Sequence, residues 1–469
     1  MSLFAFSNRL SMNRIRWPIR ITRFFHQDES SNGGFIFLAL FLGVILSFLI
    51  TRNVTMSIVF LGGIAAQVLF CIYPLAGLYS ILALSVWVQL LFPQDPEVFG
   101  ITGVKIIGWA AFVGWLYNIF ITRKDKIRRT GLGGLILAII LMGIFSAGWA
   151  RELPFLWRKV FTLVQLAALV YMITSLVTDE NKLLGVFIVI ASAVWASNLA
   201  SIYQYISDPR IRTMGFDRDP NYASAVNIVG IFFTIFLLVR SRTIFLKIVM
   251  GLMLLVMLSG QVLTLSRAGI ISLGAAALFL TLKQRNKTKS LICIIGVAII
   301  VLLFSPKKFY MRVIRPRTYA ESASISNRML ELQTGLNMIA YNPILGVGLG
   351  NFGYNYLRYV NYHEQRAAHN TYVDIAAELG LPGLAVFLWL FIKVWLNLRR
   401  VQRQAFFRSD FLYHAAFYME IAFIGYLINA IFISAKFEKF PWILMGISSA
   451  LISLQHRNRN SISYEKHDN

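Results

Sequence analysis

The sequence predicts an all-α integral membrane protein that crosses the lipid bilayer many times. Of its 469 residues, 57% are hydrophobic and only 14% are charged. A single water-soluble domain could not hide so much apolar surface. Apolar runs of about 17 to 25 residues, the length that crosses about 30 Å of hydrocarbon, recur from Phe35 to Leu454. We therefore expect a polytopic protein with about 12–14 transmembrane helices.

The apolar runs divide the chain into five parts. A basic N-terminal tail, residues 1–32, precedes a bundle of transmembrane helices over residues 33–304. A long extramembrane stretch, 305–370, separates this bundle from C-terminal transmembrane helices over residues 371–455, and a short tail, 456–469, follows. The individual spans are expected near residues 33–50, 54–71, 74–92, 101–121, 131–149, 156–177, 182–206, 221–240, 243–264, 267–283, 289–304, 371–396, 411–433 and 438–455.

Positive charge gathers on one side of the predicted bundle. The basic segments are residues 122–129, 240–242, 283–289, 398–408 and 456–460. If the spans alternate, these segments share one side, which the positive-inside rule assigns to the cytoplasm. The arginine-bearing tail shows no signal-peptide cleavage site, so both tails are expected in the cytoplasm. The net charge of +24 then reports membrane orientation, and we expect no nucleic-acid partner.

The stretch 305–370 is the one large loop on the opposite, non-cytoplasmic side. It holds eight lysines and arginines against three glutamates, a net charge of +5. Such an excess is unusual for an outer loop and indicates an anionic partner on that side. Within the loop, residues 324–342 place apolar side chains at near-helical spacing, which predicts an amphipathic helix at the membrane interface.

A glycine-rich segment follows this amphipathic helix. Gly348, Gly350 and Gly353 satisfy the GxGxxG string that elsewhere binds a dinucleotide. Here the string follows no strand and opens no βαβ unit. A tight turn that lets the backbone approach a partner is the favoured interpretation.

Two pairs of acidic residues fall in predicted outer loops. They are Asp95 with Glu97 and Asp217 with Asp219. Carboxylates one residue apart can bind a divalent cation, as in metal-dependent sugar transferases. An aspartate beside a proline is also ordinary turn chemistry, and we favour this interpretation.

Five arginines lie at the predicted outer ends of the spans or in the outer loops. The guanidinium group stays charged, and its planar fork suits phosphate oxygens. The alternative is that arginines anchor helices by reaching into the interface. Glycine and serine neighbours favour anion binding for two of them in particular. The candidates are Arg210, Arg212, Arg267, Arg328 and Arg366, and the two favoured ones are Arg212 and Arg267.

The stretch "RAAHNTYVDIAAELGLPG", residues 366–383, places polar groups at the outer end of a span. His369 falls at the start of the helix, where the positive end of the helix dipole favours the neutral imidazole, which can accept a proton. Asn370, Asp374 and Glu378 share one helical face. Two carboxylates inside a membrane require a polar cavity with a cation or a proton. The alternative is a helix cap and an inter-helix salt bridge.

Three motifs resemble the O-antigen ligase and polymerase superfamily of the bacterial envelope. They are "SRAG" (266–269), "NRMLELQTGLNMIAYNPILGVGLGNF" (327–352) and "HNTYVDIAAELGLPGL" (369–384). The resemblance covers about residues 212–384, and it implies a fold like that of the C-type glycosyltransferases with a large periplasmic loop. It also implies transfer of a glycan from undecaprenyl diphosphate to an acceptor hydroxyl at the periplasmic face of the bacterial inner membrane.

The resemblance assigns roles to particular residues. The histidine of the family's HN pair, a candidate base, is His369, and the arginines used around the diphosphate are Arg212 and Arg267. Arg328 matches the arginine that opens the loop helix. Arg366 is a further diphosphate candidate, while the groups expected to support the site are Arg210, Asn370, Asp374 and Glu378. If arginines neutralise the diphosphate, no metal or other cofactor is needed, and attack by the acceptor inverts the sugar.

Several functions remain open at this stage. Within the family, a ligase that places a glycan on an acceptor such as lipid A core is favoured, and a polymerase of repeat units is the first alternative. A protein O-glycosyltransferase comes last because additional periplasmic helices are not evident. Outside the family, a lipid-linked glycan transporter and a structural or receptor protein of the envelope are the alternatives.

Overall fold

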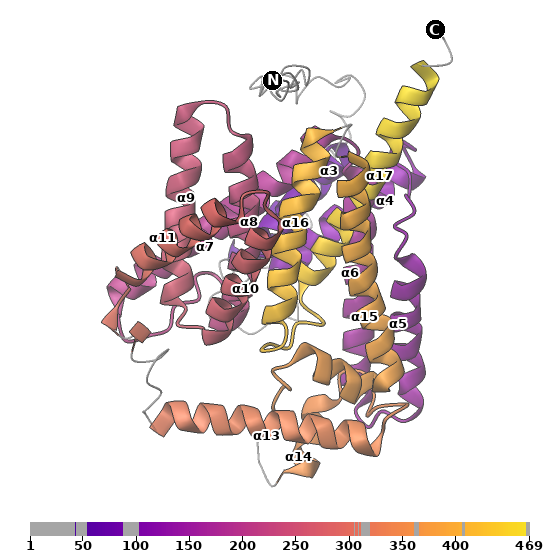
Figure 1. Ribbon diagram of the computed structural model, residues 1–469. Coiled ribbons are helices and arrows are strands. Elements are labelled where there is room, and N and C mark those ends of the chain that lie inside the picture. The colour runs from indigo at the N-terminus through magenta and orange to yellow at the C-terminus, as the bar shows by residue number, and fades with distance from the viewer. Residues whose placement is uncertain are drawn as a thin grey trace. The chain divides into compact units, whose positions relative to one another are not determined.

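The computed structural model of the protein (Figure 1) describes residue 43 and residues 54–87, 103–303, 305–307, 309–310, 319–360, 365–405 and 409–465. The predicted tail 1–32, the first predicted span apart from residue 43, and the pair Asp95 and Glu97 lie outside these residues. The chain forms two compact units, Met1–Val68 and Leu69–Asn469. The second unit holds all helices from α3 onward and all candidate site residues.

The described elements are helices, and no strand occurs among the described residues. In chain order they are α2 (Val54–Ile72), α3 (Pro74–Leu84), α4 (Gly103–Phe120), α5 (Gly133–Phe145), the short 3₁₀ helix η2 (Ser146–Gly148), α6 (Leu153–Leu176), α7 (Glu180–Ser207), α8 (Pro220–Arg240), α9 (Ile244–Leu263), α10 (Arg267–Lys283), α11 (Lys287–Leu303), α13 (Tyr319–Tyr341), α14 (Phe352–Tyr359), α15 (Thr371–Ala405), α16 (Asp410–Asn429) and α17 (Lys439–Glu465). The predicted all-α class is confirmed for the described residues.

Side-chain caps explain where many of the long helices begin. In five helices the side chain of the residue before the helix accepts a hydrogen bond from a backbone N–H of the first turn. These residues are Asp179 before α7, Asp219 before α8, Thr243 before α9, Ser266 before α10 and Ser409 before α16. These residues satisfy donors that the helix itself leaves unpaired. The boundaries therefore follow from local sequence.

Six described helices are long and apolar enough to cross a membrane: α6, α7, α8, α9, α15 and α16. Their outward surfaces are also apolar. On α9, for example, Ile244, Phe245 and Leu252 are all more than half exposed. Exposed apolar surface of this extent is expected when lipid rather than water surrounds a helix. The chain is a polytopic membrane protein, and the full count of about 12–14 crossings stays a prediction.

Hydrogen bonds between distant connections define two ends of the bundle. At one end, the Arg457 guanidinium donates to the Thr178 carbonyl (3.0 Å), and the Ser409 hydroxyl donates to Glu180 (2.9 Å). We call this the basic end, because it carries the lysine- and arginine-rich connections. At the other end, the Thr213 amide donates to the Leu263 carbonyl (3.3 Å). We call this the site end.

Helix α15 is broken near the site end. Gly380 has φ 70° and ψ −179°, which is not a helical conformation, and Pro382 has no N–H to continue the backbone hydrogen bonds of the helix. The carbonyls of Ala377 and Glu378 accept instead from the amides of Val347 (2.8 Å) and Gly348 (3.0 Å) in the glycine-rich turn. The Leu381 amide in return donates to the Pro343 carbonyl (2.7 Å). This exchange satisfies irregular backbone that would otherwise be costly in a membrane.

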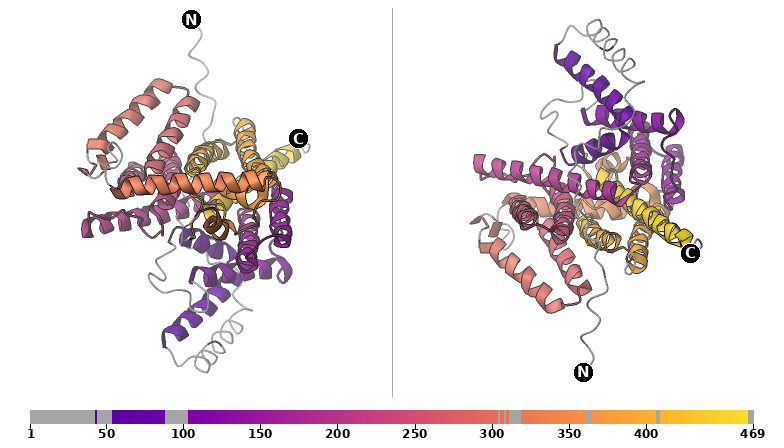
Figure 2. Two further views of the ribbon diagram at one scale, coloured as in Figure 1. Left: turned by 90° about the horizontal axis from the view of Figure 1, so that it is seen from below. Right: turned by 90° about the horizontal axis from the view of Figure 1, so that it is seen from above.

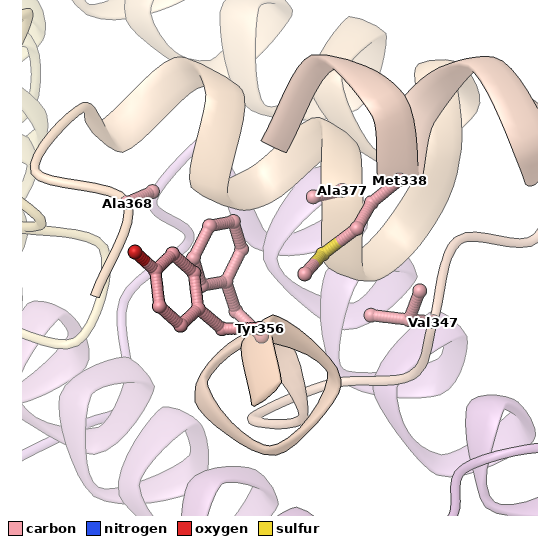
Figure 3. Packing of buried hydrophobic residues seen from close by; sticks show 6 residues of the cluster. Met338, Val347, Tyr356, Ala368 and Ala377 are labelled. Atoms are coloured by element: carbon pink, nitrogen blue, oxygen red, sulfur yellow. The ribbon is translucent and has the colours of Figure 1, made fainter. Parts of the chain in front are cut away.

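The amphipathic helix predicted in the large loop is α13. It lies across the ends of the long helices rather than beside them, at the bottom of Figure 1 and in front in the left view of Figure 2. Figure 3 shows the apolar cluster that fixes it, in which Met338 of α13, Val347, Tyr356 of α14 and Ala368 pack against Ala377 of α15. The loop segments are therefore docked onto the broken part of α15.

We expect Gly380→Ala to destabilise the protein strongly. A Cβ at this position would lie 2.1 Å from the Ile344 carbonyl oxygen, and the backbone conformation is one that essentially only glycine adopts. We expect a loss of about 3 kcal/mol, seen as a lower midpoint of thermal unfolding in detergent.

The matched control is Gly274→Ala in α10, where an added Cβ meets nothing within 4 Å. Alanine is the better helix former, so this variant should unfold at or slightly above the wild-type temperature. Equal behaviour of the two variants would contradict the proposed role of Gly380.

Candidate functional site

The connection between α9 and α10 forms a sharp corner at the site end. Leu265 has a positive φ of 50°, which is uncommon outside glycine. The Ser266 hydroxyl caps α10 by accepting from the Gly269 amide (3.2 Å) and donates to Asn221 Oδ1 (3.0 Å). Arg267 is therefore placed in the first turn of α10, where the positive end of the helix dipole favours a bound anion.

Arg212 reaches the same corner from the loop between α7 and α8. Its Nε donates to the Thr264 carbonyl (3.1 Å), and its Nη2 donates to Asn221 Oδ1 (3.1 Å). The Arg267 guanidinium is half-buried, and the structure records no hydrogen bond from it to a described residue. The corner thus holds one arginine in a fixed orientation beside a second one that is available to a ligand.

His369 lies in the turn that leads into α15. Its backbone has φ 46°, and its ring makes no recorded hydrogen bond to any described residue. The following Asn370 is a helix cap, because its Oδ1 accepts from the amides of Tyr372 (3.0 Å) and Val373 (3.1 Å). The amide of Asn370 is thus used for structure, while the imidazole of His369 remains available for chemistry.

Helix α16 connects the start of α15 and the start of α10 at the site end of the bundle. Gly425 of α16 packs against Ala276 of α10, and the two helices run in opposite directions. With a rise of about 1.5 Å per residue, Arg267 and Ala430 both lie beyond this contact toward the site end. The Thr371 amide donates to the Ala430 carbonyl (2.9 Å), which ties the start of α15 to that level.

The connection between α16 and α17, residues 430–438, supplies a buried cation that the sequence analysis did not identify. Lys436 Nζ lies 2.7 Å from Asp374 Oδ1 and 2.7 Å from Glu378 Oε2. All three side chains are almost completely buried. Lys436 is therefore the cationic partner that two carboxylates inside α15 require.

Glu378 also holds the glycine-rich turn. Its Oε2 accepts from the Gly350 amide (2.6 Å), and its Oε1 accepts from the Phe352 amide (3.2 Å) at the start of α14. Gly350 has φ 75°. The negative charge of the Glu378 carboxylate is thus stabilised by two backbone N–H groups as well as by Lys436. On the expected common face, Asn370 caps the helix, while Asp374 and Glu378 pair with Lys436 of the α16–α17 connection. These contacts hold the elements of the site together.

The charge balance of α15 was the signal that could have found Lys436. Two carboxylates at i and i+4 in an apolar helix require compensation, and Lys436 lies in a short connection between two predicted spans. Sequence alone offers no way to choose it over the other lysines and arginines near the membrane, such as Lys159 and Lys439.

The remaining candidate arginines occupy two further places. Arg366 Nη1 lies 3.4 Å from Glu331 Oε1 of α13, and Arg328 stands one turn before Glu331 on the same helix. Both are at the site end, where α13 packs against α15. Arg210 is different, because its side chain is 91% exposed and pairs with Asp208 of its own loop.

The acidic pair after Arg212 serves the loop and the start of α8. Asp219 caps α8 by accepting from the amides of Asn221 (2.7 Å) and Tyr222 (2.9 Å). Asp217 is buried beside a small cavity and accepts from the Arg218 amide (2.6 Å). Among the described residues, no group of three His, Cys, Asp or Glu side chains could hold a metal ion. The turn interpretation of this pair is the one that the contacts support.

A comparison with protein families identifies the segment that carries most of this site. The O-Antigen ligase family model matches residues 252–388. This segment of the chain is similar to the O-antigen ligase family. No curated protein matches the chain. The match implies an enzyme of the glycosyltransferase type, and six described helices are long and apolar enough to cross a membrane.

The O-antigen ligase segment contains Arg267, Arg328, Arg366 and His369. Lys436 lies outside it, as does Arg212. The tertiary structure brings Lys436 to the segment through Asp374 and Glu378, and it brings Arg212 to the corner before Arg267. The candidate site therefore extends beyond the matched segment.

We expect Lys436→Met to destabilise the fold by about 3–5 kcal/mol, because two buried carboxylates lose their counterion. The triple variant Lys436→Met, Asp374→Asn, Glu378→Gln removes the unpaired charges and should recover part of this loss. The midpoint of thermal unfolding in detergent measures both effects.

The control is Lys182→Met, which removes a half-exposed partner of Asp179 and should change stability by about 0.5 kcal/mol or less. The assignment of Lys436 fails if Lys436→Met unfolds at the wild-type temperature, or if the triple variant is no more stable than Lys436→Met alone.

Asp217 gives a prediction about pH. Burial raises the pKa of its carboxyl to about 7, with a further upward contribution from the charge of Glu438. In the unfolded chain the pKa of an aspartate is about 3.9. The folded protein therefore binds the proton of Asp217 more strongly than the unfolded chain does. For this reason the contribution of Asp217 to stability falls as pH rises from about 4 to 7. We expect Asp217→Asn to be more stable than wild type at pH 8, by up to about 4 kcal/mol in the free energy of unfolding, and to unfold at a higher temperature there. At pH 4 the two proteins should unfold at nearly the same temperature. An equal difference at both pH values would contradict the assignment.

Proposed function

We propose that the protein is a membrane glycosyltransferase that moves a glycan from undecaprenyl diphosphate to an acceptor hydroxyl at the periplasmic face. The observation that carries the proposal is that Arg212 is held at the corner before Arg267, at the same end of the helical bundle as the start of α15, which follows His369. The family match over residues 252–388 supports the class of reaction.

The arginine corner suits the leaving group. When the bond between the anomeric carbon and the diphosphate breaks, negative charge develops on the departing oxygen. The Arg212 guanidinium is already held by Thr264 and Asn221, so it requires little reorganisation. Arg267 adds a second positive charge at the N-terminus of α10. We propose that these two groups neutralise the diphosphate, so that the transfer requires no metal ion or other cofactor.

The imidazole of His369 suits the acceptor. A neutral imidazole draws the proton from the acceptor hydroxyl while the oxygen attacks the anomeric carbon. The new bond forms as the bond to the diphosphate breaks, so a single displacement inverts the configuration of that carbon. The proton passes to His369, and the electron pair of the broken bond leaves with the diphosphate.

Asp374 and Glu378 act through position in this proposal. Both carboxylates are engaged by Lys436, and Glu378 also accepts two backbone hydrogen bonds. These contacts favour a role in fixing the start of α15, and with it His369, over direct contact with the sugar. Arg328 on α13 and Arg366, which pairs with Glu331 of α13, are proposed to meet an outlying anionic part of the donor.

The charge distribution supports the sidedness of the proposal. The basic end is assigned to the cytoplasm of a bacterial inner membrane and the site end to the periplasm, with both termini in the cytoplasm. Helix α13 then lies at the periplasmic membrane interface, close to where a polyprenyl lipid presents its diphosphate. The donor would approach from the membrane lipid.

The two forms of the proposal, a ligase and a polymerase, differ in the acceptor. We favour a ligase, which transfers a finished glycan to an acceptor glycan such as lipid A core. A polymerase would instead transfer a growing chain to another lipid-linked repeat unit. Both use the same donor and the same residues.

We expect His369→Ala to lower transfer by about 10²–10⁴-fold, because the acceptor loses its base. Arg267→Ala should lower it by about 10²–10³-fold, because charge on the diphosphate is less stabilised. Glycan transfer by the full-length protein in liposomes, from a lipid-linked donor to an added acceptor, measures both.

The matched control is Arg158→Ala, an exposed arginine near the site end on α6, which should transfer at the wild-type rate. Correctly inserted His369→Ala and Arg267→Ala proteins with wild-type rates would rule out the site. Single additions to acceptor glycan support a ligase, whereas lengthening of the lipid-linked glycan supports a polymerase.

A further inference from the structure

The basic end of α15 carries a groove that the proposed reaction does not use. It is lined by Trp395, Leu396, Arg399, Arg400, Arg403 and Gln404 and has a volume of about 310 Å³. We call it the arginine groove. Its residues form two rows at i and i+4, with the apolar pair toward the middle of the helix and the arginines toward its end.

The arginines of the groove have no acidic partner among the described residues. No described carboxylate forms an ion pair with Arg399, Arg400 or Arg403. The Arg399 guanidinium packs over the Trp395 ring, 5.9 Å from its centre. Like charges spaced this way on a helix repel one another, so an anion bound between them would remove an unfavourable interaction.

The nearest buried carboxylate is already engaged. Glu420 of α16 is fully buried, pairs with Lys283 of α10 and accepts from Gln402 Nε2 (2.6 Å) and Trp395 Nε1 (2.8 Å). These contacts fix the Trp395 indole as a wall of the groove. The negative charge of Glu420 is thus already balanced by Lys283.

An apolar surface leads directly into the groove. Leu388, Trp389 and Ile392 are each between 38% and 48% exposed along the same spanning helix, and Trp395 and Leu396 continue this surface to the arginines. A free phosphate would use only the arginine end. A molecule with both a phosphate and acyl chains would use the whole surface, with its phosphate at the level where tryptophan marks a membrane interface.

We propose that the arginine groove binds an anionic phospholipid, with the headgroup phosphate on Arg399, Arg400 and Arg403 and an acyl chain along Leu396, Ile392 and Trp389. The guanidinium forks bind the phosphate oxygens, and the apolar surface selects a lipid over a soluble phosphate. This site is independent of the glycan transfer proposed above and lies at the opposite end of the bundle.

The test is lipid binding to the full-length, delipidated protein in detergent, followed by native mass spectrometry with added phosphatidylglycerol. The double variant Arg400→Gln, Arg403→Gln removes two exposed guanidinium groups and should weaken binding by about tenfold or more. The variant Arg400→Lys, Arg403→Lys keeps the charge and should bind within a few-fold of wild type.

The matched control is Lys124→Gln, Arg129→Gln, which removes two exposed positive charges from another connection at the basic end. It should bind phosphatidylglycerol like wild type. Zwitterionic phosphatidylethanolamine and inorganic phosphate should each compete poorly.

Three outcomes would overturn the proposal. They are equal binding by the glutamine variant and wild type, an equal loss in the Lys124 and Arg129 control, and competition by inorganic phosphate as strong as that by phosphatidylglycerol. Thermal unfolding of each variant without lipid confirms that a loss of binding does not come from misfolding.

Discussion

The architecture of the site depends on one buried lysine between two carboxylates. Burying three charges is costly, and their mutual attraction offsets that cost only when the geometry is close and the remaining polar atoms are satisfied. Lys436 meets Asp374 and Glu378 at 2.7 Å each, and the Gly350 and Phe352 amides complete the coordination of Glu378. The network therefore joins α15, the α16–α17 connection and the glycine-rich turn in one unit.

The break in α15 makes this network possible. A continuous helix would use the Ala377 and Glu378 carbonyls internally, and the glycine-rich turn would have no backbone partner in the membrane. Because Gly380 and Pro382 interrupt the ladder, those carbonyls accept from Val347 and Gly348 instead. The extramembrane loop is thereby attached to a spanning helix by main-chain hydrogen bonds.

The protein separates charges that hold the fold from charges that remain available. Lys436, Lys283 and Arg212 have fixed partners within the structure. Arg267 at the site end and the arginines at the basic end of α15 have no recorded carboxylate partner among the described residues. This division is the physical basis for assigning one set to architecture and the other to anionic ligands, a diphosphate at one end and a lipid headgroup at the other.

The sequence by itself determined the class of fold, most of the helical elements, the resemblance to the O-antigen ligase family and the residues worth testing. Apolar length, capping residues such as Ser266 and Asp219, and the motifs around Arg267 and His369 are all local features that a linear pattern records. Only the tertiary structure decided that Lys436 neutralises Asp374 and Glu378, that Arg212 meets the corner before Arg267, and that Asn370 serves as a cap rather than as a free polar group. Lys436 lies 58 positions beyond Glu378 in the sequence. No periodicity specifies which distant side chains meet, because that choice depends on how whole helices pack.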